Sequence, residues 1–259
     1  MKIGAYQFTV SGSIAKNMDA IRKGISLAAK ESARLLVFPE CALTGYPVRE
    51  ERSSNVDFQT LDVCFAELRK LSVQNAMYLL VGSVTKDGDT YHNSAILFTP
   101  DGCDTTPYHK RALWGWDLKN FSEGNPGGIW AVDKLRMGVR ICYEVRFPEY
   151  FRELYRAKVD FTVVMFNDIS ETDDLERYEL IKAHLRTRAV ENVCTVMSVN
   201  DASSYQTAPT AVLDNCGKVV TELPRDHEGL LLFDYQTPEL SFGAQGRKAV
   251  SDRLTKGSF

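Results

Sequence analysis

Residues 138–149, with the sequence GVRICYEVRFPE, place one cysteine where an apolar run gives way to charged side chains. The run 135–141 predicts a buried strand, and Pro148 is typical of the first turn of a helix. Cys142 therefore lies at a strand-to-helix elbow, where a thiol can be both held and exposed. A cysteine thiolate is a nucleophile, so this position suits covalent catalysis, although a lone cysteine in such a context is more often a small buried hydrophobic residue.

Two other predicted strand ends carry charged side chains. The apolar run 35–38 leads through a proline into Glu40, and Lys110 follows a short predicted strand at 105–108. The ends of strands in an open α/β sheet converge on one crevice, so Glu40, Lys110 and Cys142 could meet there. A thiol, a carboxylate base and an ammonium group are the parts that an acyl-transfer reaction needs.

These three segments resemble the signatures of the nitrilase or carbon-nitrogen hydrolase superfamily, in its amidase-like branch. That family has a Glu after an apolar strand, here FPE at 38–40, and a Lys after Tyr-x, here YHK at 108–110. Its third signature, Cys-Tyr-Asp/Glu-x-Arg-Phe-Pro-Glu, is matched by residues 142–149 at every specified position. The order of the three signatures is the family's order, and the resemblance extends from the first strand to about Asp234.

The resemblance implies a catalytic triad of Glu40, Lys110 and Cys142. Glu40 would accept the thiol proton as Cys142 attacks a carbonyl carbon, and would return that proton to the departing amine. Lys110 and the backbone N–H of Tyr143 would stabilise the oxyanion. Water activated by Glu40 would then hydrolyse the thioester, so ammonia or an amine leaves first.

The expected reaction is hydrolysis of a non-peptide carbon-nitrogen bond in a small-molecule amide or carbamoyl-amine. A nitrilase shares the same triad and stays an alternative, as does a non-catalytic binding protein on the same scaffold. Omega-amidase, carbamoyl-amine hydrolase and simple aliphatic amidase activities are all compatible with the sequence. A serine hydrolase and an NTPase are disfavoured because the chain has neither G-x-S-x-G nor G-x-x-x-x-G-K-[ST].

One position departs from the family's pattern. Many members carry a second Glu after the lysine, followed four residues later by Phe and then Gly, and here Asp117 takes that place in a loop that is one residue shorter. The shorter side chain reaches Lys110 only if the loop moves inward. Glu123 is the other candidate for the role.

Further side chains near the three signatures are weaker candidates. Tyr143 and Glu144 are possible accessory or substrate-positioning residues, and Arg146 is interpreted as part of an ion-pair network that holds the elbow. An acidic segment after the predicted strand 160–167 favours a cationic amide or else complements the start of a helix that is capped by Ser170 or Thr172. Its acidic residues are Asp168, Glu171, Asp173, Asp174 and Glu176.

Strand and helix patterns alternate along the chain and predict a layered α/β protein. Apolar residues recur with helical spacing over 14–28 and 58–71, and a long helix is expected over 173–192. Strands are expected at 2–10, 35–40, 78–84, 94–98, 160–167 and 193–200, with hairpin turns at 100–102 and 214–217. Periodicity alone would also fit a doubly wound single sheet; the family resemblance implies a four-layer α-β-β-α sandwich.

The composition predicts one domain over residues 1–259. Of these, 31 are basic and 34 acidic, so neither a nucleic-acid partner nor a membrane surface is expected. The N-terminus lacks the features of a signal peptide, which predicts a cytoplasmic protein whose six cysteines are mostly free thiols. The His and Cys spacings are not those of metal sites, and neither a metal nor another cofactor is expected.

The segment 238–259 has few apolar residues and predicts an extended C-terminal arm. The family resemblance implies that such an arm contacts a partner subunit. The expected assembly is a homodimer or a higher homo-oligomer.

Overall fold

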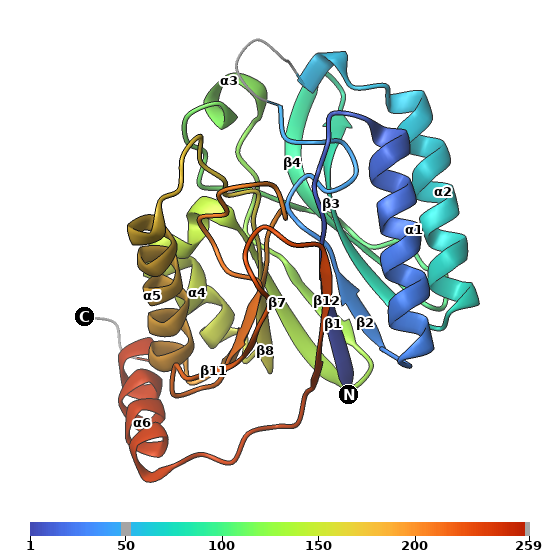
Figure 1. The fold of residues 1–259 in the computed structure, drawn as a ribbon. Coiled ribbons are helices and arrows are strands. Elements are labelled where there is room, and N and C mark those ends of the chain that lie inside the picture. Colours follow the sequence, from blue (N-terminus) through green and yellow to red (C-terminus); the bar gives the residue numbers. More distant parts are fainter. Residues whose placement is uncertain (48–52, 257–259) are drawn as a thin grey trace.

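The computed structural model describes residues 1–47 and 53–256. Two six-stranded sheets pack face to face, and helices cover the outer face of each sheet (Figure 1). The expected four-layer α-β-β-α sandwich is therefore confirmed. Within the described residues, none of the helices combines the length and the apolar character that crossing a membrane requires.

The first sheet is formed by the N-terminal strands and one late strand. Its order is β12 (Gly229–Asp234), β1 (Lys2–Gln7), β2 (Leu35–Val37), β3 (Tyr78–Asp87), β4 (Thr90–Phe98) and β5 (Tyr108–His109). The strands β1, β2 and β3 are parallel, because a helix returns the chain between each pair. The other pairs in this sheet are antiparallel.

The second sheet is formed by the later part of the chain. Its order is β11 (Val219–Glu222), β10 (Ala211–Leu213), β9 (Thr195–Val199), β8 (Phe161–Met165), β7 (Leu135–Ile141) and β6 (Ile129–Val132). The strands β7, β8 and β9 are parallel at its centre. Each of them is a continuous run of buried residues over most of its length, as expected for strands covered on both faces.

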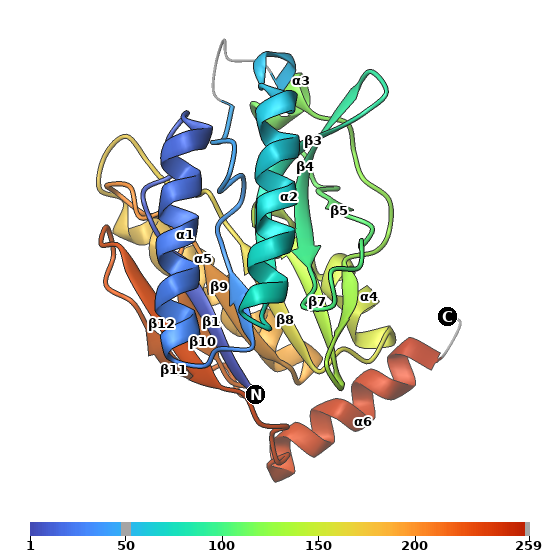
Figure 2. The same ribbon diagram turned by 90° about the vertical axis from the view of Figure 1, so that its right-hand side faces the viewer.

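Helices α1 (Ile14–Lys30) and α2 (Phe58–Gln74) lie side by side on the first sheet (Figure 2). Helices α4 (Pro148–Arg156) and α5 (Leu175–Asn192) cover the second sheet. Side-chain oxygens of Ser13, Asp57 and Asp174 cap the N-termini of α1, α2 and α5. The cap of α5 is thus Asp174 rather than Ser170 or Thr172.

Successive side chains of a strand point to opposite faces of the sheet, so the apolar side chains of one strand belong to different cores. Leu35 and Val37 of β2 point into the space between the sheets, where they join the same core as Val139 of β7 and Val163 of β8. Leu36 points the other way and packs against α1 and α2. A third core lies between the second sheet and helices α4 and α5. Strands β2 and β8 are therefore packed against apolar side chains on both faces, which fixes the position of the turn that follows each of them.

The turns that follow β2 and β8 meet at one end of the sandwich. The backbone N–H of Glu40 donates to the carbonyl oxygen of Phe166 at 3.2 Å, which joins the two sheets there. Gly82 of β3 lies directly under the same turn, because a Cβ at this position would be 2.2 Å from the carbonyl oxygen of Pro39. A glycine is therefore required for the Glu40 turn to pack on β3.

Several elements differ from the sequence-based expectations. The strands β6 and β12 were not expected, and β3 and β4 continue to a tight turn at Gly88, whose φ is +56°. The expected extended arm at 238–259 is wrong over most of its length, because Phe242–Lys256 form a helix, α6. Polar contacts to α5 and α4 hold that helix, including Arg247 Nε to the carbonyl oxygen of Val190 at 3.2 Å. Whether the arm contacts a partner stays a prediction.

Candidate active site

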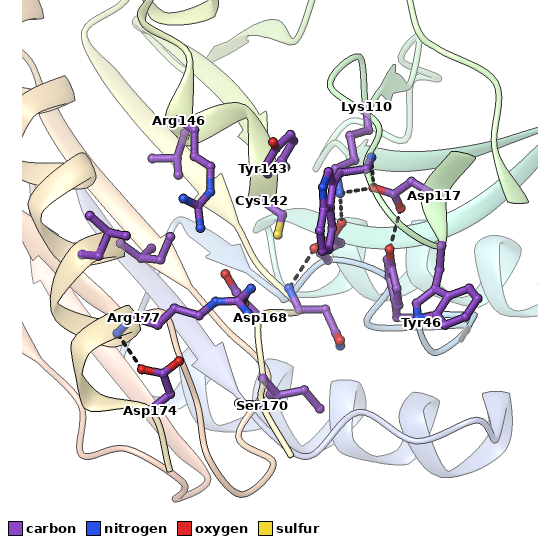
Figure 3. A pocket seen from close by; sticks show the side chains of 18 of the residues that line it. Tyr46, Lys110, Asp117, Cys142, Tyr143, Arg146, Asp168, Ser170, Asp174 and Arg177 are labelled. Carbon is purple, nitrogen blue, oxygen red and sulfur yellow. Dashed lines mark hydrogen bonds and ion pairs between the residues drawn. The ribbon is translucent and has the colours of Figure 1, made fainter. Parts of the chain in front are cut away.

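A cavity of about 1200 Å³ opens where the strand ends of the two sheets meet (Figure 3). The predicted site residues Glu40, Lys110, Asp117, Cys142 and Tyr143 all line it. They come from the turns after β2, β5 and β7 and from the short helix α3 (Asp117–Asn120). The structure thus brings together segments that are as much as about a hundred residues apart in the sequence.

The ammonium group of Lys110 lies between two carboxylates. Its Nζ atom is 2.8 Å from Glu40 Oε1 and 2.7 Å from Asp117 Oδ2, and all three side chains are at most 2% exposed. Burial alone would lower the pKa of Lys110, but Glu40, Cys142 and Asp117 together raise that pKa well above its usual value. Lys110 is therefore a permanent cation in a site of low dielectric constant.

Glu40 is held through both carboxylate oxygens. Oε1 accepts hydrogen bonds from Lys110 Nζ at 2.8 Å and from Asn93 Nδ2 at 2.7 Å. Oε2 accepts one from the backbone N–H of Asn167 at 2.8 Å. Burial, with a contribution from Asp117, raises the pKa of Glu40 although Lys110 and Asn93 lower it. A carboxylate with a raised pKa is suited to accept and return protons near neutral pH.

Cys142 is the first residue of a 3-10 turn, η2 (Cys142–Arg146), which follows β7 directly. Its backbone has a φ of 46°, in the left-handed region that is strained for a non-glycine residue. Burial and the nearby Glu40 raise the pKa of the Cys142 thiol well above 9.0, while Lys110 lowers it. The thiol therefore rests in its protonated form and needs a base to become a nucleophile.

Glu144 stabilises the strand-to-helix elbow at Cys142 through hydrogen bonds. It is fully buried, and its Oε1 accepts hydrogen bonds from Tyr108 Oη at 2.7 Å and from the backbone N–H of Arg111 at 2.8 Å. Its Oε2 accepts one from the backbone N–H of Ile141 at 2.6 Å. Glu144 is not among the residues that line the cavity, so it positions the Cys142 turn rather than contacting a substrate.

Asp117, rather than Glu123, is the carboxylate that reaches Lys110. Glu123 is exposed and lies outside the cavity lining. The second oxygen of Asp117 accepts a hydrogen bond from Tyr46 Oη at 2.7 Å. The sequence analysis missed Tyr46 and Asn93, because no local pattern marks a side chain that meets its partner only when distant strands come together.

Arg146 does not belong to an ion-pair network among the described residues. Its guanidinium group lies 5.7 Å from the ring centroid of Tyr143 and lines the cavity (Figure 3). Of the two carboxylates that suggested such a network, Glu144 binds backbone N–H groups and Glu149 is exposed. The expectation of an ion pair is wrong, and Arg146 is a cation that faces the cavity.

Two acidic side chains of the segment beyond β8 form ion pairs, and a third caps a helix. Arg177 Nη2 lies 2.6 Å from Asp168 Oδ1, and Arg225 Nη2 lies 2.7 Å from Asp173 Oδ1. Asp174 caps α5. In the described residues, His, Cys, Asp and Glu side chains do not gather in groups of three or more that could hold a metal ion.

We expect Glu144→Gln to destabilise the protein by about 2–3 kcal/mol, because an amide NH₂ would face a donor where a buried carboxylate oxygen accepted hydrogen bonds. Urea unfolding measures the change. Glu149→Gln, an exposed acidic residue of the adjacent turn, is the control and should stay within about 0.5 kcal/mol of wild type. Wild-type stability of Glu144→Gln would contradict the role of Glu144 in the elbow.

Known proteins resemble this chain over most of its length. The family model described as carbon-nitrogen hydrolase matches residues 2–241. A 2-oxoglutaramate amidase of Bacillus subtilis is 28% identical over 88% of this chain and 88% of its own length. An omega-amidase of Xenopus tropicalis is 24% identical over 78% of this chain and 74% of its own length.

Solved structures of amidases share the fold of this protein. The crystal structure of an amidase from Nesterenkonia sp. superposes with a TM-score of 0.81 at 23% identity, covering 98% of this chain and 95% of that one. A mutant of an amidase from Nesterenkonia sp. carries the acetamide moiety of fluoroacetamide on its active-site cysteine. Because the family model spans nearly the whole chain, the protein belongs to the carbon-nitrogen hydrolase family.

Proposed function

We propose that this carbon-nitrogen hydrolase cleaves a small linear amide through a thioester on Cys142. The observation that carries the proposal is the buried ammonium of Lys110, held by Glu40 and Asp117 at the wall of the cavity into which Cys142 opens. A thiol, a base with a raised pKa and a fixed cation supply the nucleophile, the proton acceptor and the oxyanion partner.

The reaction has two steps. In the first, the Cys142 sulfur bonds to the amide carbon while Glu40 accepts the thiol proton, and the tetrahedral oxyanion forms beside Lys110 and the N–H of Tyr143. Two of the three donors of the Lys110 ammonium are used by carboxylates, which leaves the third for the oxyanion. The C–N bond then breaks, and the amine leaves with the proton from Glu40. In the second step water, deprotonated by Glu40, releases the carboxylic acid and restores the thiol.

Asp117 holds the ammonium group of Lys110 together with Glu40. Its carboxylate is itself held by the Tyr46 hydroxyl, which fixes its position beside Lys110. Asp117 stands where many family members have a second Glu. The helical turn of α3 brings the shorter side chain within 2.7 Å of Lys110, which supports the same role for it here.

Arg146 favours an amide that carries a carboxylate at its other end, although Glu171, Asp174 and Glu176 also line the cavity. Arg146 faces the cavity without an ion-pair partner among the described residues, whereas Asp168 is already paired with Arg177. An anionic substrate group would meet a free guanidinium, the side chain that best matches a carboxylate. The relative from Bacillus subtilis is named for an amide of this kind. A cationic amide finds less support.

The cysteines and helix α6 support proposals on the cellular compartment and the oligomeric state. All six cysteines are free thiols, which supports a reducing compartment, the cytoplasm. Helix α6 leaves apolar side chains uncovered, Phe242 being 94% exposed and Leu254 48%. This exposure supports a homodimer or higher homo-oligomer in which α6 contacts a partner subunit.

A panel of substrates tests the proposed function. We expect ammonia release from monoamides of short dicarboxylic acids and slower release from neutral amides such as butyramide, with no turnover of nitriles or carbamoyl-amines. Cys142→Ala is the control and should lose nearly all turnover while it stays folded. Turnover of nitriles in place of amides would replace the amidase by a nitrilase, and an inert panel with an unreactive Cys142 would indicate a binding protein.

Arg146→Met tests the choice of substrate. For a dicarboxylic monoamide KM should rise about 10- to 100-fold, as expected when a hydrogen-bonded charge pair is lost, while kinetics on butyramide should stay unchanged. Arg156→Met removes an exposed arginine at the end of α4 and is the matched control. Equal effects of Arg146→Met on both substrates would contradict recognition of a carboxylate.

A further inference from the structure

Asn93 connects the two charged partners of the site although it does not line the cavity. It lies on β4 and is 1% exposed. Its side-chain Nδ2 donates to Glu40 Oε1 at 2.7 Å, and its backbone carbonyl oxygen accepts from the N–H of Lys110 at 2.8 Å. One residue thus contacts Glu40 with its side chain and Lys110 with its backbone.

The orientation of the Asn93 amide is set by Glu40. With the amide turned over, Oδ1 would face a carboxylate oxygen and repel it. In the orientation observed, Oδ1 is buried and finds no hydrogen-bond partner among the described residues. Leaving a buried acceptor unpaired is costly, so the bond to Glu40 determines the arrangement.

The acceptor sites of Glu40 are unequally filled. A carboxylate oxygen accepts about two hydrogen bonds. Oε1 accepts two, from Lys110 and Asn93, and Oε2 accepts one, from the backbone of Asn167. Oε1 therefore has no lone pair left for a proton, whereas Oε2 has one.

We propose that Asn93 is a positioning residue for Glu40: together with Lys110 it saturates Oε1 and so leaves Oε2 as the oxygen that receives the thiol proton of Cys142. This assignment rests on Glu40 being the base of the proposed function. Without Asn93 the carboxylate gains a free site on Oε1 and can rotate or take the proton on the wrong oxygen. Asn93 acts in this way without touching the substrate.

The charges around Glu40 predict how the pH dependence of the rate changes when Asn93 is replaced. The titratable groups around Glu40 are Lys110, Asp117, Cys142, Cys41 and Tyr46. The Asn93 hydrogen bond lowers the pKa of Glu40, so its removal raises that pKa. Because Glu40 must be ionised to accept a proton, the acid limb of the rate profile should move to higher pH.

Asn93→Leu, which keeps the branched shape and the number of side-chain heavy atoms but has no donor, tests the proposal. We expect kcat to fall about 10- to 100-fold with little change in KM, since a hydrogen bond to a charged group is lost. The acid limb of kcat/KM, and of the rate at which iodoacetamide alkylates Cys142, should both move to higher pH. Asn93→Ala serves the same test if the leucine variant does not fold.

Asn192→Leu is the matched control. Asn192 is also a buried asparagine with an unpaired Oδ1, but it lies in α5 outside the cavity lining. Its loss should reduce stability without moving the pH profile. Wild-type kcat and an unmoved acid limb in a folded Asn93 variant would overturn the proposal. If the wild-type protein hydrolyses no amide, the proposed function fails instead, and the alkylation profile still decides the role of Asn93.

Discussion

The site depends on one buried cation. The ammonium group of Lys110 is 2% exposed, and leaving such a charge unpaired would cost several kcal/mol. Glu40 and Asp117 offset that cost at 2.8 and 2.7 Å, and they in turn need Lys110 because both carboxylates are buried. Removing Lys110 would leave two buried carboxylates without their cation, and removing either carboxylate would leave the ammonium with one partner in place of two. The three side chains therefore behave as a unit, and the fold has to place them together.

The two sheets meet at this cluster. Glu40 follows a strand of the first sheet, yet it donates through its backbone to Phe166 and accepts through its side chain from Asn167, both beyond a strand of the second sheet. Cys142 follows β7 of the second sheet, and Lys110 follows β5 of the first. The base and the nucleophile are therefore set relative to one another by how the two sheets pack. A substitution in the core between the sheets should therefore change the distance between the base and the nucleophile.

Much of this arrangement could be predicted from the sequence. Apolar runs predicted the central strands β2, β7 and β8. The resemblance to the three family signatures then singled out Glu40, Lys110 and Cys142 at or near strand ends. The strand β12 was missed because it pairs with β1, more than two hundred residues away. Helix α6 was missed because polar contacts rather than an apolar stripe hold it.

The side chains around the cluster were harder to predict for a related reason. Asn93 and Tyr46 act through partners that are distant in the chain, and nothing in their local sequence indicates those partners. Arg146 was misassigned because spacing suggested a pair with Glu144, whereas Glu144 is turned inward to the backbone of the elbow. Spacing along a chain gives the neighbours of a residue but not the direction in which its side chain points.

The central claim is that the amide carbon becomes bonded to the Cys142 sulfur. Rapid quenching in acid within a single turnover of a dicarboxylic monoamide, followed by intact-mass and peptide mass spectrometry, measures this directly. We expect the protein to gain the mass of the acyl group, without the amide nitrogen, on the peptide that contains Cys142. Turnover without any such adduct, or an adduct confined to one of the other five cysteines, would contradict it.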